Sequence, residues 1–480
     1  MTAVRFTDAV LLDLEWAVLI YFLVVNGFYA VLLGAAAREM LDHVRSVRGE
    51  LRSRLLGSSA VPKISILAPA FNEESTIEDS VRSLLALYYP NLEIVVVNDG
   101  SKDDTVAVLT EHFELVPILS VLEAHVPTKP LRHLYRSRTH PNLVVADKVN
   151  GGKADALNVG LNLASGELVC AIDADTLIEP DALQRMVRPF LASDTVVAAG
   201  GTIRIANGST IRRGRILEMK APRHALAGFQ VIEYLRAFLF GRLGWNRLGG
   251  NLIISGAFGL FTRQAVLAIG GYAPDTVGED MELVIRLRRR GYETGGPSDV
   301  DFVPDPVAWT EVPESLRVLG RQRDRWHRGL CDVLWRHRDV IFNRRYGSMG
   351  LVAFPYFVFV ELLAPVVEAT GLIAGVIGLA LGIVNVHFAL LYFLLAYGLG
   401  MLLSLLTLVL EELSFQRYRG LRDRLFLITW ALLENLGFRQ LTVAWRLRGI
   451  WKYLRGRTDW GVMERRGLNR ADVSPPSVTP

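Results

Sequence analysis

Residues 168–175 read LVCAIDAD, a short apolar run that leads directly into two aspartates. The apolar part, Leu168–Ile172, has the length and composition of a strand that is buried on both faces. Two further runs, Ile64–Ala68 and Glu93–Val97, are built in the same way and also end in polar residues. These three runs predict neighbouring strands of one buried sheet.

Helical segments separate the predicted strands. Ser75–Leu87 follows an acidic turn, a second helix begins at Lys153, and Met281–Arg289 is amphipathic. This alternation, between about Lys63 and Pro306, predicts an α/β domain with a mainly parallel sheet flanked by helices. Polar residues collect just past the carboxyl ends of the strands, where open sheets of this kind bind their ligands.

The composition restricts the class of protein. Of the 480 residues, 51% are hydrophobic and 21% are charged, and the mean hydropathy is +0.27. This excludes a disordered chain or a disulfide-stapled miniprotein, and it is too apolar for an ordinary soluble protein. Lysine and arginine number 53 against 49 acidic residues, without a long basic run, so we expect no nucleic-acid partner. We expect Cys170 and Cys331 to be free thiols in a reducing compartment.

The segment Trp16–Ala37 contains no charged residue. It is long enough to cross roughly 30 Å of hydrocarbon as a helix, so residues 1–37 are predicted to be an extracytoplasmic N-terminus and a first transmembrane helix. A cleaved signal peptide is the alternative, but acidic residues precede the apolar stretch. The arginines that follow place the next domain in the cytoplasm. They are Arg38, Arg45, Arg48, Arg52 and Arg54.

A second apolar region, residues 346–416, has no lysine or arginine. Its length predicts two transmembrane helices, Leu351–Ile383 and Phe388–Leu410, joined by a short turn. Pro355 and Pro365 should kink the first of them.

The segment after this region is harder to place. Glu434 and Arg439 would lie near the middle of any membrane span over Leu425–Trp445, where charges are costly. We therefore predict an interfacial or re-entrant helix within residues 417–457. Residues 458–480 are predicted to be a disordered cytoplasmic tail.

The polar residues after the strands suit phosphate and metal chemistry. Asp173 and Asp175 would repel each other unless a cation or solvent compensated their charges, and oxygen ligands suit Mg²⁺ or Mn²⁺. Lys153 follows two glycines at the start of a helix, where an anion is favoured. Simple loops and a solvated lysine are the alternatives, and Asp99 also suits an ordinary turn.

Two later motifs complete the set. Glu279 and Asp280 begin the amphipathic helix, so they either cap it or include a general base, which typically contributes about 10²- to 10⁴-fold in rate. In the motif from Gln322 to Trp326, Arg325 could stabilise a leaving diphosphate and Trp326 could stack on a sugar ring. A snorkelling arginine and an interfacial tryptophan are the alternatives.

The order of these motifs resembles that of membrane-bound family-2 glycosyltransferases. The similarity covers roughly Lys63 to Leu330, and the bacterial poly-N-acetylglucosamine, hyaluronan and chitin-oligosaccharide synthases look nearest. The motifs are Pro69-Ala70-Phe71-Asn72-Glu73, Asn98-Asp99-Gly100-Ser101, Gly152-Lys153-Ala154, Asp173-Ala174-Asp175, Gly278-Glu279-Asp280 and Gln322-x-x-Arg325-Trp326.

The resemblance implies a Rossmann-like, glycosyltransferase A-type α/β domain that binds a nucleotide sugar. This cytoplasmic domain would occupy residues 38–310, embedded between transmembrane helices, with interfacial helices over residues 311–345 and two transmembrane helices over residues 346–416. It also implies site residues. The residues implied for the nucleotide sugar are Ala70, Phe71, Glu73, Asp99, Lys153 and Asp173. Those implied for the acceptor and diphosphate are Gly256, Glu279, Gln322, Arg325 and Trp326. By the same resemblance, Asp173 and Asp175 hold Mg²⁺ or Mn²⁺, and Asp280 is the catalytic base.

The activity implied is a processive, inverting transfer from a UDP-sugar to a growing β-linked polysaccharide, coupled to export through a multi-pass protein of the cell membrane. The implied partners are the UDP-sugar, a glycan acceptor and membrane lipids, and a small membrane subunit is compatible with them. A non-processive transferase acting on a membrane lipid is the alternative, and a catalytically silent scaffold is a third.

Two features depart from the family pattern. Residues 111–143 form a longer insertion than expected and suggest a lid or a partner surface. No arginine-rich cyclic-di-GMP-binding domain follows Arg457, so direct control of the cellulose-synthase kind is not expected.

Overall fold

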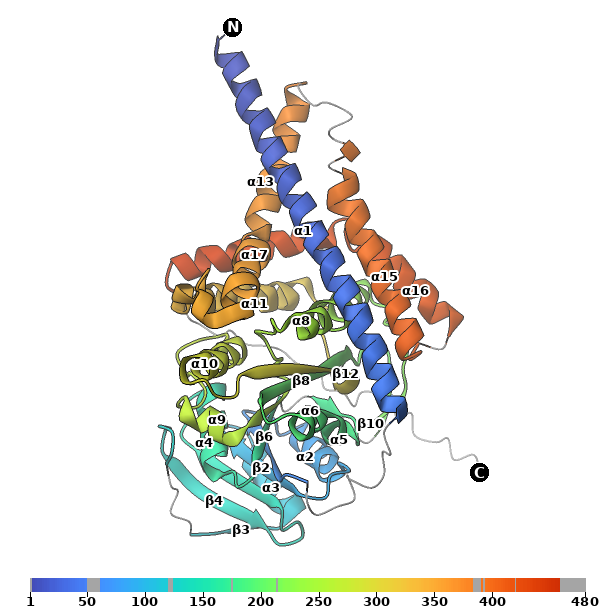
Figure 1. The fold of residues 1–480 in the computed structure, drawn as a ribbon. Helices are drawn as coiled ribbons and strands as arrows, with labels where there is room; N and C mark the ends of the chain where they lie inside the picture. Colours follow the sequence, from blue (N-terminus) through green and yellow to red (C-terminus); the bar gives the residue numbers. More distant parts are fainter. Residues whose placement is uncertain are drawn as a thin grey trace, which may run out of the picture.

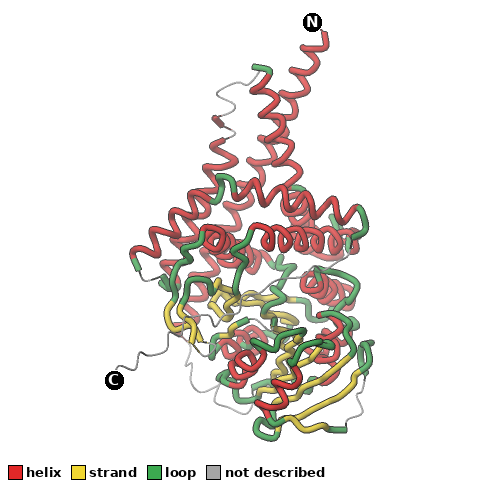
Figure 2. The backbone as a smooth tube through the Cα atoms, turned by 180° about the vertical axis from the view of Figure 1, so that it is seen from behind, coloured by secondary structure: helices red, strands yellow, loops and turns green. Residues whose placement is uncertain are grey.

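The computed structural model shows an α/β body from which several helices project on one side (Figures 1 and 2). The long helix α1 (Thr2–Gly49) runs from the far end of this projection down to the body. The structure describes residues 2–49, 61–119, 124–173, 176–212, 215–382, 390–391, 393–418 and 420–457.

In the described part of the chain, ten strands form one sheet in the order β3-β4-β5-β2-β1-β6-β11-β8-β12-β7. They are β1 (Ile64–Ala70), β2 (Leu92–Asn98), β3 (Leu115–Pro117), β4 (Leu131–Ser137), β5 (Leu143–Lys148), β6 (Leu168–Ile172), β7 (Leu177–Ile178), β8 (Val196–Ile205), β11 (Phe258–Thr262) and β12 (Asp299–Thr310). A separate pair consists of β9 (Thr210–Arg212) and β10 (Arg215–Glu218).

Helices cover both faces of the sheet and separate its strands. They are α2 (Ile77–Leu85), α3 (Thr105–Phe113), α4 (Lys153–Leu163), α5 (Ala182–Met186), α6 (Arg188–Ala192), α7 (Ala225–Leu235), η1 (Arg236–Arg242), α8 (Leu243–Leu248), α9 (Arg263–Ala268) and α10 (Glu279–Thr294).

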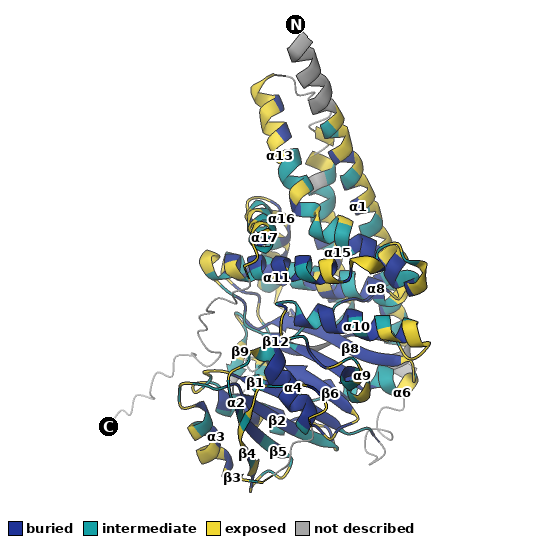
Figure 3. Cartoon of the chain, turned by 90° about the vertical axis from the view of Figure 1, so that its left-hand side faces the viewer, coloured by how far each residue is buried: buried dark blue, intermediate teal, exposed yellow. Residues whose placement is uncertain are grey.

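The three predicted strands are confirmed as β1, β2 and β6, and the predicted helices as α2, α4 and α10. All five residues of β6 are buried, which explains its uninterrupted apolar sequence. The side chains of β1 alternate between two cores. Ile64 and Ile66 join the cluster on one face of the sheet, and Leu67 joins the cluster on the other. Figure 3 shows this buried centre in dark blue.

The prediction of a mainly parallel sheet is wrong, because the sheet is mixed. The strands β5, β2, β1 and β6 are parallel, but β11 is antiparallel to both of its neighbours, β6 and β8. The chain leaves β8 and re-enters the sheet at β11 from the same edge, after α7 and α8, so β11 must run in the opposite direction. Apolar runs alone do not encode direction.

Two helical stretches, Asp13–Arg45 and Met349–Ala380, are long and apolar enough to cross a membrane, by length and composition. The first contains the predicted span Trp16–Ala37. The second consists of η4 (Met349–Ala353), α12 (Phe354–Tyr356), η5 (Phe357–Leu362) and α13 (Ala364–Ala380). Its π-helical segments flank Pro355, and Pro365 lies in the first turn of α13, as expected from prolines that interrupt a helix.

The predicted span Phe388–Leu410 lies partly outside the described residues, as does the turn before it. Its described part is η6 (Leu394–Gly398) and most of α15 (Leu399–Ser414), which projects from the body beside α1 (Figure 1). The predicted disordered tail, residues 458–480, is also outside the described residues.

Residues 417–457 contain two helices, α16 (Leu421–Leu433) and α17 (Phe438–Leu454), where a single helix was predicted. Gly437 separates them with a φ of 89°, a left-handed conformation that glycine adopts without strain. The charges that argued against a span are paired: Glu434 accepts from Arg236, and both nitrogens of the Arg439 fork donate to Glu368. Pairing lowers the cost of burying these groups.

Helix α11 (Leu316–Arg336) packs along α17, and the 3-10 turns η2 (Arg338–Val340) and η3 (Arg344–Tyr346) follow it. On α11, Trp326 is exposed and Arg328 is buried. Residues 111–143 include β3 and β4, which extend the sheet at its edge. Cys170 and Cys331 are both free and buried, as predicted.

The junction between α1 and β12 provides a stability prediction. Burial, reinforced by Asp299 and Glu39, raises the pKa of Asp301 to about 6. A carboxyl whose pKa is raised on folding opposes folding once the pH exceeds its ordinary pKa, and the full cost is reached above about pH 6. Asp301→Asn should therefore stabilise the protein by about 1–2 kcal/mol at pH 8 and have little effect at pH 4.

Thermal unfolding across this pH range measures the effect. Asp194→Asn, which changes an exposed carboxylate, is the matched control and should leave the midpoint unchanged. An equal shift for Asp301→Asn at both pH values would contradict the assignment.

Candidate functional site

The ammonium group of Lys153 lies at the centre of the candidate site. Its Nζ is 2.7 Å from Asp173 Oδ1 and 3.3 Å from Glu279 Oε1, and it lies 3.4 Å from the carbonyl oxygen of Gly256. These partners come from the start of α4, the end of β6, the start of α10 and the loop before β11. One side chain thus joins four segments that are far apart in the sequence.

Folding shifts the pKa values of Lys153 and Glu279 in this cluster. Burial alone would lower the pKa of Lys153, but the carboxylates of Asp173 and Glu279 more than offset it and hold the pKa above its ordinary value. Burial, with Asp280 nearby, raises the pKa of Glu279. A lysine that stays charged between carboxylates is a fixed positive group, suited to binding an anion that displaces one of them.

A small pocket opens beside this cluster. Lys153, Gly256, Glu279 and Asp280 line its polar side, and apolar residues such as Ile254 line the rest. Asp280 Oδ2 accepts from the Gly256 amide at 3.3 Å, and Oδ1 accepts from the Met281 amide in the first turn of α10 at 2.8 Å. The positive end of the α10 dipole therefore lies at the two acidic residues that begin it.

Gly256 leaves little room for a side chain beside Lys153. A Cβ at this position would lie 3.0 Å from Lys153 Nζ and 3.8 Å from Asp280 Oδ2. The backbone can therefore approach both groups only because no side chain intervenes.

Asp99 anchors the loop that carries Lys153. It is 4% exposed, and its Oδ1 lies 2.5 Å from Lys148 Nζ and accepts from the Gly151 amide at 2.9 Å. Its Oδ2 accepts from the Gly152 amide at 2.8 Å. Gly152 itself has a φ of 88°. The buried carboxylate thereby fixes the turn immediately before Lys153, whatever further contacts it makes with a ligand.

The first predicted loop joins the same framework. The carbonyl oxygen of Ala70 accepts from the Asp99 amide at 2.9 Å, and the Glu73 amide donates to Thr105 Oγ1 at 2.9 Å. Phe71 is 46% exposed, as a ring available to a ligand would be. The structure therefore places Ala70, Phe71 and Glu73 beside the Asp99 loop, at the ends of the paired strands β1 and β2.

The motif from Gln322 to Trp326 lies on α11, which contacts the residue before α10 through glycines but contributes no described residue to the lining of the pocket. A Cβ at Gly329 would be 3.2 Å from Gly278 Cα, immediately before Glu279 and Asp280. Trp326 is exposed and its ring is covered by the Arg323 guanidinium at 4.4 Å. Backbone contact between Gly329 and Gly278 thus brings α11 against the start of α10, about one helical turn from Arg325 and two from Gln322.

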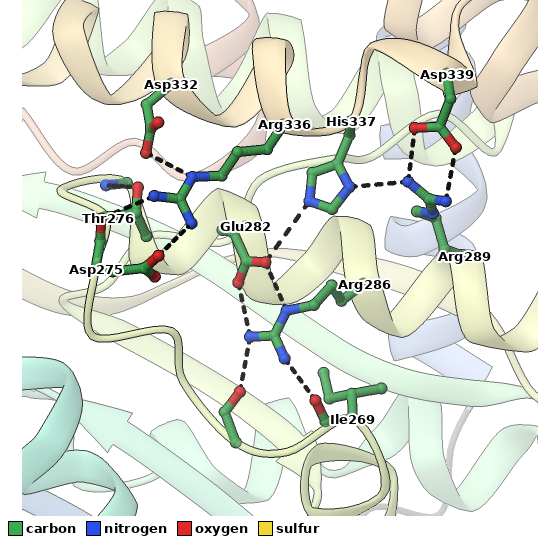
Figure 4. Close-up of polar contacts among 12 residues, drawn as sticks. Ile269, Asp275, Thr276, Glu282, Arg286, Arg289, Asp332, Arg336, His337 and Asp339 are labelled. Carbon is green, nitrogen blue, oxygen red and sulfur yellow. Dashed lines mark hydrogen bonds and ion pairs between the residues drawn. The ribbon is translucent and has the colours of Figure 1, made fainter.

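Polar contacts behind the pocket tie the loop before α10 to both α10 and α11 (Figure 4). Arg286 makes a double hydrogen bond to Glu282 at 2.6 and 2.7 Å and also donates to the carbonyl oxygens of Ile269 and Gly271. From α11, Arg336 donates to Asp275 Oδ2 at 2.8 Å. Planar arginine forks of this kind fix orientation as well as distance, so the loop before Asp280 is positioned from both sides.

A divalent metal fits the donor set in part. If Asp173, Glu279 and Asp280 are all ionised, they carry three negative charges around one ammonium, and Mg²⁺ typically uses one or two carboxylates with substrate phosphates. Asp173 is partly exposed and has carboxylate oxygens of the required type. Asp175 lies outside the described residues. Among the described residues, no group of three or more acidic, histidine or cysteine side chains is arranged as a ready-made metal site.

Several residues of this site had not been singled out in the sequence. Lys148 is fully buried between Asp99 and Asp155, at 2.5 and 2.6 Å. Tyr272 lines the pocket, and burial raises the pKa of its phenol. Lys148 could have been noticed in the sequence, because a lysine at the end of an apolar run is unusual. Nothing in the sequence pointed to Tyr272.

Comparison with known proteins defines the class. The model described as "Glycosyl transferase family 2" matches residues 65–268, and "Glycosyl transferase family group 2" matches residues 168–405. Together they cover the strands, Lys153, Asp173, Asp280 and α11. The chain thus belongs to family 2 of the glycosyltransferases.

Individual relatives show which enzymes of this family the chain resembles. The chain is 32% identical over 276 residues to a poly-β-1,6-N-acetyl-D-glucosamine synthase of Staphylococcus epidermidis, covering 58% of this chain and 56% of the relative. The synthase of Staphylococcus aureus strain COL is 32% identical over 274 residues, covering 57% of this chain and 56% of the relative. The chain therefore spans little more than half the length of the curated relatives it matches.

A solved structure supports the fold. The mannosyltransferase of Pyrobaculum calidifontis, in complex with GDP-Man and Mn²⁺, aligns with a TM-score of 0.50 and 20% sequence identity. The alignment covers 88% of this chain and 99% of that one. The predicted glycosyltransferase A-type architecture is thereby supported as a mixed-sheet α/β fold.

The anchoring role of Asp99 is testable. Asp99→Asn replaces a carboxylate with a neutral amide. Buried Lys148 then loses its ionised partner, and one of the two glycine amides loses its acceptor oxygen. We expect the free energy of unfolding to fall by about 2–4 kcal/mol and the binding of UDP to weaken. Chemical denaturation and nucleotide titration measure the two effects. Asp104→Asn, at an exposed position in the same loop, should change neither. Wild-type stability and UDP affinity in the Asp99 variant would contradict the anchoring role.

Proposed function

We propose that this protein transfers a sugar from a UDP-sugar to a growing β-linked polysaccharide, with inversion at the anomeric carbon. The observation that carries the proposal is the cluster of Lys153, Asp173, Glu279 and Asp280 around one pocket at the edge of the sheet. The resemblance to synthases of a β-linked N-acetylglucosamine polymer supports a polysaccharide product.

Each residue has a role in this proposal. Asp280, at the start of α10, would remove the proton from the acceptor hydroxyl as its oxygen attacks the anomeric carbon. Lys153 would move from its carboxylate partners to the diphosphate and hold the departing UDP. Arg325 would neutralise the same charge from α11, while Gln322 and Trp326 would contact the acceptor.

Asp173, together with Asp175, would hold Mg²⁺ or Mn²⁺. The bound ion would supply charge stabilisation at the diphosphate. The Pyrobaculum neighbour was solved with a nucleotide sugar and Mn²⁺, which supports a divalent ion in this fold.

Export of the product is part of the proposal. The catalytic body would lie in the cytoplasm, with α1 and the helices from Met349 to Ser414 crossing the membrane. Charged pairs such as Glu368 with Arg439 lie within this helical bundle, where ionisable groups usually mark a pathway for a polar substrate. A processive enzyme would pass its chain along such groups.

The decisive experiment for this proposal uses the full chain in nanodiscs. A panel of UDP-sugars with Mn²⁺ or Mg²⁺ should give UDP release and a ladder of polymer lengths from one sugar. A single sugar on lipid would support the lipid-acceptor alternative, and absence of UDP release with every donor would refute the proposed activity.

The base assignment gives a sharper prediction. Asp280→Asn should lower turnover by about 10²- to 10⁴-fold, because the acceptor proton has no base, while UDP still binds. Asp194→Asn, an exposed carboxylate that does not line the pocket, is the control and should retain most activity. Near-normal turnover in Asp280→Asn would exclude the assignment.

Metal removal gives a further prediction. Chelation should abolish turnover, and added Mn²⁺ or Mg²⁺ should restore it. Asp173→Asn should raise the metal concentration needed for half-maximal activity by at least about tenfold, since one ligand loses its charge. An unchanged metal titration in this variant would place the ion elsewhere.

A further inference from the structure

A second hollow lies where the α/β body meets α16. The loop after β10 lines it with Lys220, Arg223 and His224, and the first turn of α16 contributes Arg422. Glu314, from the segment before α11, completes the rim. Two segments that are distant in the sequence thus place basic side chains around one opening, and none of these residues belongs to the Lys153 site.

The acidic groups at this hollow are already engaged. Asp423 Oδ1 accepts from the Ala221 amide at 3.1 Å, and Glu314 accepts from Asn207 at 3.1 Å. Lys220 is paired with Glu218 at 2.8 Å. Within the described part of the chain, neither Arg223 nor Arg422 has an ion-pair partner. The hollow therefore offers two guanidinium groups to an external anion.

The framework around these arginines is rigid. The Arg422 guanidinium packs over the Phe426 ring at 5.6 Å, and that ring stacks on Trp430 at an interplanar angle of 9°. Trp430 in turn fits against Gly228 of α7, where a Cβ would lie 2.4 Å from the indole. The hydrogen bond from Ala221 to Asp423 fixes the basic loop to the same turn of α16.

Neighbouring arginines contrast with this pair. Arg424 is 2.8 Å from Glu412, and Arg417 is 3.8 Å from Glu179. These two arginines therefore form ion pairs within the protein, whereas Arg223 and Arg422 form none among the described residues.

The rest of α16 indicates which kind of molecule would present the anion to this hollow. Leu421, Leu425, Ile428 and Leu432 recur at helical spacing and are all exposed, from 72% at Leu421 to 40% at Leu432. They form an apolar stripe that begins in the same turn as Arg422. An apolar stripe next to a basic hollow matches a molecule with acyl chains and an anionic phosphate, and basic clusters at the membrane surface bind such headgroups.

We propose that this hollow, formed by Arg223 and Arg422 with Lys220 and His224, binds the phosphate-bearing headgroup of an anionic phospholipid in the leaflet that contacts α16. The inference rests on the membrane placement in the proposed function but not on the transfer reaction. The bound lipid would hold α16 and the loop 220–224 together at the membrane face. A free phosphate compound has the same headgroup chemistry, and the test separates the two sources.

The experiment measures binding of a fluorescent phosphatidylglycerol to the full chain in phosphatidylcholine nanodiscs. The wild type should bind it in preference to the corresponding phosphatidylcholine probe. Replacing both residues, Arg223→Ala and Arg422→Ala, should weaken binding roughly 30-fold, because each basic side chain near an anionic surface contributes about fivefold. The double replacement by lysine should keep most of the preference, which controls for misfolding.

A matched control tests the location. Arg132→Ala with Arg136→Ala removes the same charge from exposed positions on β4, at the far side of the body, and should leave binding unchanged. Equal weakening in this control, or an undiminished preference in the Arg223 and Arg422 variant, would overturn the site. Displacement of the probe by inorganic phosphate at micromolar concentration would overturn the lipid as the ligand.

The readout is lipid binding, so it does not depend on catalysis. An inactive protein that still shows the preference would contradict the proposed transfer while supporting this site, and an active protein without the preference would do the reverse.

Discussion

The site depends on the ion pairs of Lys153 with Asp173 and Glu279. These contacts join the end of β6, the start of α4 and the start of α10, which lie far apart in the sequence. A partly buried ammonium and two carboxylates are costly to hold apart from one another, so each restrains the position of the others. Under the proposed function, an incoming diphosphate would replace one of these carboxylates at Lys153.

Around this contact, two supports position the residues of the candidate site. On one side, Asp99 fixes the glycine turn before Lys153 through hydrogen bonds to the Gly151 and Gly152 amides. On the other side, Arg286 of α10 and Arg336 of α11 hold the loop that precedes Asp280 (Figure 4). Because Arg336 lies on α11, this second support connects the loop to a helix that packs along α17. Under the proposed function, movement of these helices would change the position of Asp280.

Much of the body could be predicted from the sequence, since β1, β2 and β6 are continuous apolar runs whose periodicity is local. The direction of β11 could not, because it depends on where the chain re-enters the sheet. The helices α16 and α17 were predicted as one element, since a single glycine at 437 decides the break and paired charges, such as Arg439 with Glu368, look like unpaired ones in a sequence. For the candidate site, Lys153 and Asp280 could be proposed from the sequence, because each belongs to a local motif. Lys148 and Tyr272 could not, because they join the site only through contacts made on folding.

The most direct test of this account is a cryo-electron microscopy structure of the full chain in nanodiscs with UDP and Mn²⁺. The account predicts the diphosphate within hydrogen-bonding distance of Lys153 Nζ, the ion on Asp173, and the carboxylate of Asp280 facing the open side of the same pocket. A nucleotide bound away from Lys153, with the lysine still paired to Asp173 and Glu279, would contradict it.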